Sequence, residues 1–318
     1  MKKIILFLTT ILLTLSTLSG CKLSVLNVGV TTYPIQYLVS RIAQDKVNVI
    51  QFSEGATITR TQIRDDYKEL LETTDVVFHF GKLEPYLAVY LTEFQNSNAQ
   101  LIDLTSNAGV YKFQRYTVTQ VSDRQVTLED SYYNSNLFNE INVYDKDPML
   151  WLDPITMISM AGTVKDWLVE KFPEERNLFN TNYELLKQEL ARMDADYQEL
   201  WKQDISFVSV TPSFGNWQKA YGIQVYPLIL SRFGVLPSDE QLAVIKERIK
   251  ADGVKLIVHE PNLSEDMEAL YQTIKTELEL ESIELHTLSF LSEKDITDNK
   301  NYMTIMFENL NTLEGLKP

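Results

Sequence analysis

The chain has 318 residues, of which 44 are acidic and 29 are basic, so its formal net charge at pH 7 is −15. This negative surplus argues against nucleic acid as a partner, since phosphate binding requires clustered Lys and Arg. It also argues against recruitment to an anionic membrane surface by charge. Hydrophobic residues make up 44% of the chain, and the length suggests two domains.

The N-terminal segment indicates export. Two lysines precede an uncharged apolar run over residues 4–18, which is about 22 Å long as a helix and therefore short for a hydrocarbon core of about 30 Å. Such a run is typical of a signal peptide. The motif Leu-Ser-Gly-Cys that ends at Cys21 resembles the bacterial lipobox. We expect residues 1–20 to be removed, and Cys21, the single cysteine, to anchor the protein by lipid to the extracytoplasmic face of the cell membrane.

Strands and helices alternate directly after this segment. Apolar runs predict strands over residues 25–31, 47–52 and 76–80, and amphipathic patterns predict helices over residues 34–43 and 65–72. Strand–helix–strand units at this spacing imply right-handed crossovers and a parallel sheet.

Residues 110–146 are polar and aromatic and have no helical period. We interpret them as a long loop or hairpin excursion near the cleft between two lobes.

The most regular segment is residues 174–203, which would form a helix about 45 Å long. Its apolar residues recur at spacings of three and four along one face: Phe179, Tyr183, Leu186, Leu190, Met193, Tyr197 and Leu200. A coiled-coil seam is the alternative, but a strand follows at once, which favours a helix lying along two lobes. A helical connector resists bending, so the lobes would tilt slightly instead of closing widely.

The same alternation restarts after this helix. Strands are predicted over residues 207–210, 256–259 and 283–288, and helices over residues 242–251 and 267–278. The predicted fold is therefore α/β, with two lobes that each carry a mostly parallel sheet flanked by helices, joined by one long rigid helix. We place the first lobe at 21–172, the connecting helix at 173–204 and the second lobe at 205–318.

A series of short motifs spans the chain after the signal peptide. They are Thr31-Thr32-Tyr33-Pro34, Gly55-Ala56, Gly81-Lys82-Leu83-Glu84-Pro85, Asp147 to Pro154, Phe214-Gly215, Lys219-Ala220-Tyr221-Gly222, Leu236-Pro237-Ser238 and Tyr302 to Leu310. In this order and spacing they resemble the metal-binding lipoproteins that feed manganese and zinc ABC importers, some of which are described as adhesins. The resemblance implies two α/β lobes with metal bound between them.

The resemblance also implies four metal-ligand positions, which that family fills with His, Glu or Asp. Here those positions hold Thr59, Met149, Thr211 and either Lys300 or Asn301. Zn²⁺ prefers imidazole, thiolate or carboxylate ligands, and Mn²⁺ prefers carboxylate and imidazole. A hydroxyl binds either ion weakly, and a lysine repels it. The usual metal site is therefore expected to be absent, with no cofactor assigned.

Relocated ligands are the alternative. The chain has three histidines, His79, His259 and His286, and each is predicted to lie in or at the end of a strand. A strand histidine is more often a hydrogen-bonded structural residue than a ligand. However, His79 and His259 are predicted to face the cleft, where Asp153 or Glu260 would complete a makeshift site for Zn²⁺ or Mn²⁺.

The leading hypothesis is a lipid-anchored, extracytoplasmic solute-binding protein of the metal-importer type with a degenerate metal site. An ABC permease is then its expected partner. The alternatives are a surface adhesin or scaffold with a host or cell-surface partner, and a metal receptor with relocated ligands. No Gly-rich phosphate loop, Gly-x-Ser-x-Gly or zinc-protease motif is found, so an enzyme is not expected.

Overall fold

The computed structural model describes residues 25–55, 57–113, 133 and 135–316, together with a strand pair at 115–121 and 124–130. The predicted signal peptide and Cys21 lie outside these residues. In the described part of the chain, none of the helices combines the length and the apolar character needed to cross a bilayer.

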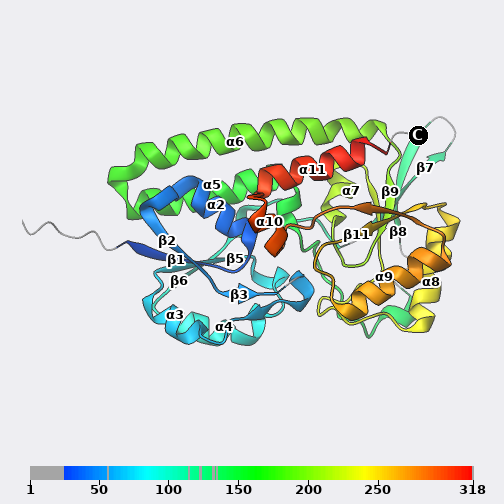
Figure 1. Ribbon diagram of the computed structural model, residues 1–318, viewed down its shortest axis with the longest axis horizontal. Helices are drawn as coiled ribbons and strands as arrows, with labels where there is room; N and C mark the ends of the chain where they lie inside the picture. The colour runs from blue at the N-terminus through cyan, green and yellow to red at the C-terminus, as the bar shows by residue number, and fades with distance from the viewer. Residues whose placement is uncertain are drawn as a thin grey trace, which may run out of the picture.

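The first lobe is built on a four-stranded sheet in the order β2-β1-β5-β6, with every neighbouring pair parallel. Helix α2 covers one face of this sheet, and α3 and α4 cover the other (Figure 1). The elements are β1 (Leu26–Val30), α2 (Tyr33–Ala43), β2 (Val47–Gln51), α3 (Tyr67–Thr73), β5 (Val76–His79), α4 (Leu87–Asn96) and β6 (Gln100–Asp103). The predicted strands and helices of this lobe are thus confirmed.

The second lobe repeats this plan with a parallel sheet in the order β10-β9-β11-β12. Its elements are β9 (Ser206–Ser209), α7 (Gly215–Tyr221), β10 (Gln224–Pro227), α8 (Asp239–Ala251), β11 (Leu256–His259), α9 (Glu265–Glu277), β12 (Glu281–Glu284) and α10 (Glu293–Thr297). Two parallel sheets flanked by helices confirm the predicted α/β class.

One strand boundary was wrong. The strand predicted to reach Leu288 ends at Glu284, so His286 lies beyond it. The amide of His286 donates to the side-chain Oδ1 of Asn309 at 2.8 Å, and Leu288 adopts a positive φ of 59°. Both features end the strand, because the backbone no longer presents its amides to a neighbouring strand.

The long helix α6 (Arg176–Gln198) is extended at both ends by 3₁₀ turns, Pro173–Glu175 and Glu199–Lys202. Six of the seven residues in its predicted apolar stripe are fully buried, and only Tyr183 is partly exposed. The helix packs against α2 and α5 (Pro154–Lys171) and also contacts α7 and α11 (Tyr302–Glu314). Figure 1 shows it lying along both lobes, as the stripe predicts.

The excursion after residue 110 contains a hairpin of β7 (Arg115–Val121) and β8 (Arg124–Asp130). The hairpin was predicted near the cleft, but β7 contacts β10 and α7 of the second lobe. Figure 1 shows the pair at the outer end of that lobe. Near the end of the excursion, Val143 bridges to Ser231 of the second lobe.

Candidate functional site

The loops that follow the carboxyl ends of the strands meet between the two lobes. The amide of Tyr33, just after β1, donates to the carbonyl of Ser289 at 3.4 Å. The indole Nε1 of Trp151 donates to the carbonyl of Thr287 at 2.7 Å. In open parallel sheets, ligands bind outside the carboxyl ends of the strands. This boundary is therefore the candidate functional site.

Glu260, directly after β11, is 1% exposed and accepts hydrogen bonds on both carboxylate oxygens. Its Oε1 accepts from the amides of Val210 at 2.8 Å and Thr211 at 2.9 Å, and its Oε2 accepts from the hydroxyls of Thr211 and Ser213. Burial raises the pKa of Glu260, although these donors oppose the shift. The structure thus brings Thr211 and Glu260 together, and protein donors occupy the positions that a metal ion would need.

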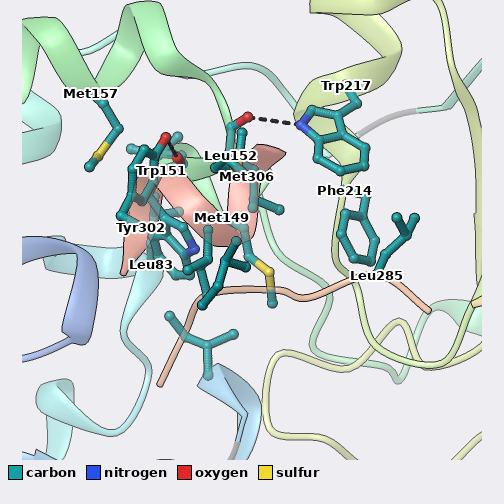
Figure 2. Packing of buried hydrophobic residues seen from close by; sticks show 14 of the residues in the cluster. Leu83, Met149, Trp151, Leu152, Met157, Phe214, Trp217, Leu285, Tyr302 and Met306 are labelled. Carbon is teal, nitrogen blue, oxygen red and sulfur yellow. Dashed lines mark hydrogen bonds between the residues drawn. The ribbon is translucent and has the colours of Figure 1, made fainter. Parts of the chain in front are cut away.

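Met149 is 2% exposed and lies just before a 3₁₀ turn, Leu150–Leu152. Its carbonyl accepts a hydrogen bond of 2.9 Å from the side-chain amide of Asn216. Figure 2 shows Met149 in an apolar cluster between Leu83 of the first lobe and Leu285 of the second. The side chain therefore fills the boundary with hydrocarbon and sulfur at a point where the resemblance implies a metal ligand.

Thr59 lies in a short 3₁₀ turn, Ile58–Arg60, and is 7% exposed. Its hydroxyl is 3.3 Å from the hydroxyl of Thr57, and the hydroxyl of Thr61 donates to the carbonyl of Thr57 at 2.8 Å. Threonine hydroxyls thus stabilise the turn itself. The first-lobe side of the boundary presents neutral oxygens here.

Lys300 and Asn301 have structural partners as well. The Lys300 Nζ lies 2.7 Å from a carboxylate oxygen of Glu308 and 3.9 Å from one of Asp295. Its hydrogen bond to Glu308 raises the pKa of Lys300, so the side chain stays charged at neutral pH. Asn301 caps α11, and its Oδ1 accepts from the amide of Met303 at 2.9 Å.

The two histidines predicted to face the cleft each have a hydrogen-bond partner within their own lobe. His79 is buried, its Nδ1 accepts from the amide of Gly81 at 2.9 Å, and burial lowers its pKa. The Nε2 of His259 is 3.0 Å from a carboxylate oxygen of Glu268, and the His259 ring lies 4.8 Å from that of Tyr271. Each histidine therefore stabilises the lobe to which it belongs through a local hydrogen bond.

Asp153 caps the N-terminus of α5. Its Oδ1 accepts from the amides of Ile155 at 2.9 Å and Thr156 at 3.2 Å, and its Oδ2 accepts from the Thr156 hydroxyl at 3.0 Å. His286, outside its predicted strand, lies 3.1 Å from Asp295 through its Nε2. Within the residues that the structure describes, no three His, Cys, Asp or Glu side chains form a group that could hold a metal ion.

The sequence reasoning missed Glu84, a carboxyl with no exposed surface in the first lobe. Its Oε2 accepts from the amide of Phe80 at 2.6 Å, and its Oε1 accepts from the hydroxyl of Tyr86. Burial raises the pKa of Glu84 to about 7. The motif Gly-Lys-Leu-Glu-Pro contained this residue, but nothing in the motif distinguishes a buried acid from a surface one.

Comparison of the sequence with known proteins gives matches over most of the chain. The family described as "Zinc-uptake complex component A periplasmic" matches residues 28–315. The zinc-binding lipoprotein AdcA of Streptococcus pneumoniae serotype 4 is 24% identical over 294 residues, which cover 91% of this chain and 55% of that protein. The chain thus spans about half the length of this relative.

Solved structures agree in fold. The zinc-bound ZnuA-like domain of S. pneumoniae AdcA superposes with a TM-score of 0.67 at 21% identity, over 92% of this chain and 98% of that one. The laminin binding protein Lmb of Streptococcus agalactiae, described as a bifunctional protein with adhesin and metal transporting activity, gives a TM-score of 0.71 at 18% identity. That match covers 92% of this chain and 100% of the other.

The fold, two parallel-sheet lobes joined by one long helix, is that of a kind of protein represented by these solved structures. The match over residues 28–315 shows which kind: this chain belongs to the ZnuA family of zinc-uptake components.

Proposed function

We propose that this protein is a lipid-anchored solute-binding component of an ABC importer of the zinc and manganese type, and that its metal site has been replaced. The observation that carries the proposal is the burial of Met149 in an apolar cluster between the lobes. A thioether is a poor ligand for Zn²⁺ and Mn²⁺, and a dry apolar contact offers no polar oxygen to replace the hydration shell of an ion.

The other positions support the same interpretation. Thr59 and Thr211 supply neutral hydroxyls, and the Thr211 hydroxyl already bonds to the carboxylate of Glu260. Lys300 brings a positive charge that is held by Glu308. A cation entering the boundary would therefore lose water without gaining an anionic or imidazole ligand. The protein would instead act with a different small solute, or regulate an importer without carrying metal.

The decisive experiment is metal binding by the purified, processed protein. Elemental analysis should find no stoichiometric Zn²⁺ or Mn²⁺, and calorimetry should find no submicromolar affinity for either. Metal at a hundredfold excess over a dissociation constant would stabilise the fold by about 2.7 kcal/mol, so thermal unfolding gives an independent readout. We expect no rise in melting temperature with either ion.

Tight stoichiometric metal in the wild-type protein would overturn the proposal. If His79→Ala or Glu260→Ala then abolished the binding, the relocated-ligand alternative would take its place. Loss of folding in these variants is checked by circular dichroism before metal is added.

A gain-of-site variant tests the same geometry from the opposite direction. Thr59→His, Met149→His, Thr211→His and Lys300→Asp together should create measurable Zn²⁺ affinity, because they restore imidazole and carboxylate ligands. The matched control replaces only Met149 by Leu, which keeps the boundary apolar and should bind no metal.

The anchor is tested separately. We expect Cys21→Ala to leave the precursor uncleaved by the lipoprotein peptidase and to change its fractionation with membranes. Wild-type protein free in the medium, with an N-terminus other than lipid-modified Cys21, would contradict the proposed location.

The permease is tested by co-purification of the wild-type protein with its importer from detergent-solubilised membranes.

A further inference from the structure

An ion pair joins the two lobes, between residues that are 206 positions apart in the chain. The guanidinium of Arg60, in the first lobe, meets the carboxylate of Asp266, in the first turn of α9, with NH1–Oδ1 at 3.1 Å and NH2–Oδ2 at 2.6 Å. The same NH2 group also donates to the carbonyl of Gly234 at 3.0 Å. Paired parallel bonds between guanidinium and carboxylate are stronger and more directional than a single contact.

The surface of the second lobe is complementary in shape to the Arg60 side chain. Gly234 has a φ of +67°, and a Cβ there would approach the Arg60 Nε to 3.1 Å and the methyl of Met267 to 3.2 Å. The absence of a side chain at Gly234 therefore lets Arg60 lie across the loop. The hydroxyl of Ser264 donates to the Oδ1 of Asp266 at 2.6 Å. This bond orients the carboxylate independently of Arg60.

The first lobe presents Arg60 from an ordered turn. The amide of Arg60 donates to the carbonyl of Thr57 at 3.1 Å, within the threonine-stabilised turn that also contains Thr59. Other polar contacts also join the two lobes here, among them the Arg232 amide bond of 2.8 Å to the carbonyl of Asn142 and the Arg232 NH2 bond of 3.4 Å to the carbonyl of Lys82. Separating the lobes would break all three Arg60 bonds at once.

We propose that Arg60 and Asp266 form a latch that holds the two lobes closed in the absence of metal. A solute-binding protein of two lobes needs some contact across its boundary to favour the closed state. In this chain the Arg60–Asp266 ion pair adds to the apolar cluster around Met149 as such a contact, and Arg60 lies one residue after the position where the family resemblance places a ligand. The latch is independent of the proposed loss of metal binding, since none of its bonds involves a metal-ligand position.

The test measures the distance between the lobes. Spin labels are placed on Val89→Cys in α4 and Thr273→Cys in α9, both exposed, in the full chain carrying Cys21→Ser. Double electron–electron resonance is recorded in detergent with EDTA. We expect Arg60→Gln and Asp266→Asn each to increase the ratio of molecules with the long label distance to molecules with the short one by about fivefold. This factor corresponds to the stabilisation that a well-formed surface ion pair provides.

Arg64→Gln is the matched control. Arg64 makes a similar two-bond pair with Asp66, at 2.9 and 2.6 Å, but within the first lobe, so its loss should leave the distances unchanged. The charge-reversed double variant Arg60→Asp with Asp266→Arg should return the ratio toward the wild-type value.

Distance distributions of Arg60→Gln and Asp266→Asn that superimpose on those of wild type and Arg64→Gln would overturn the latch. A wild-type distribution dominated by the long distance would overturn it as well. Adding Zn²⁺ separates the two proposals: zinc-induced shortening in wild type contradicts the loss of metal binding, while the effect of Arg60→Gln under EDTA still decides the latch.

Discussion

The two lobes are joined in two different ways, by a helix on one side and by a mixed seam at the strand ends. Helix α6 presents one apolar stripe whose residues recur every three or four positions, and six of the seven are completely buried. The seam combines the apolar cluster around Met149 with buried carboxyls and an exposed ion pair. A helix face depends on local periodicity, whereas the seam depends on residues that only the finished fold brings together. The two joints should therefore respond differently to mutation and to pH.

The largest effect is expected in the helix. Leu190→Ala removes a completely buried side chain and should lower the free energy of unfolding by about 2–5 kcal/mol, measured by urea titration. Leu185→Ala in the same helix is the control, since Leu185 is 52% exposed and should change stability by less than about 0.5 kcal/mol. Equal effects of the two variants would show that the stripe does not hold the lobes.

The apolar part of the seam is tested by Met149→Ala. If the lobes remain closed in solution, this truncation should lower the free energy of unfolding by about 2–4 kcal/mol, as for a core methionine. Met157→Ala, within α5 of the first lobe and also fully buried, sets the reference value. A loss at Met149 below about 0.5 kcal/mol would mean that the seam is open most of the time.

Glu84 in the first lobe should make the stability of the protein depend on pH. Its pKa is raised by burial to about 7, so its contribution to stability is complete below the unfolded pKa near 4.5 and is lost as pH rises through 7. The loss should reach at most about 3 kcal/mol. Glu84→Gln, which keeps an oxygen to accept from the Phe80 amide but does not titrate, should flatten this part of the curve.

Urea titrations between pH 4.5 and pH 7.5 measure this slope. Glu260 and Asp153 are shifted in the same direction, so the slope should decrease in Glu84→Gln without disappearing. An unchanged slope would contradict the assignment of the raised pKa to Glu84.

The smallest effect is expected at the ion pair. The hydrogen bond from Arg60 lowers the pKa of Asp266 to about 2, so its stabilisation is present above the unfolded pKa near 4 and is lost as pH falls through 2. Because Asp266 is 42% exposed, Asp266→Asn should lower stability by less than about 1 kcal/mol at pH 6. The difference from wild type should fall by about half at pH 3; a difference that does not vary with pH would contradict the pairing.

The fold was predictable because its signals are local. Alternating apolar runs and amphipathic patterns gave the parallel sheets, and the spacing of Phe179 to Leu200 gave the helix between the lobes. The end of β12 was missed because the Asn309 side chain takes the amide of His286, a contact across 23 residues. The hairpin was anticipated, but its docking beside β10 depends on tertiary contacts.

The site was less predictable. The family motifs imply ligand positions at Thr59, Met149 and Thr211, and residue chemistry alone predicts poor metal ligands there. Their actual partners could not be anticipated, because Glu260 and Thr211 lie 49 residues apart. Arg60 and Asp266 carried no signal at all, since two charged residues in an acidic chain are ordinary until folding places them face to face.

The position of the last helix affects the order in which the chain can fold. Tyr302, at the start of α11, donates its hydroxyl to the carbonyl of Trp151 and stacks on Tyr37 with ring centroids 5.2 Å apart. The hydroxyl of Tyr197 donates to the carbonyl of Met306. Residues near the end of the chain thus pack against α2, which lies near the start of the chain. During synthesis the first lobe therefore keeps an unfinished surface until α11 has emerged. For a chain that we expect to be exported, this delay favours a translocation-competent, incompletely folded state during its passage through the membrane.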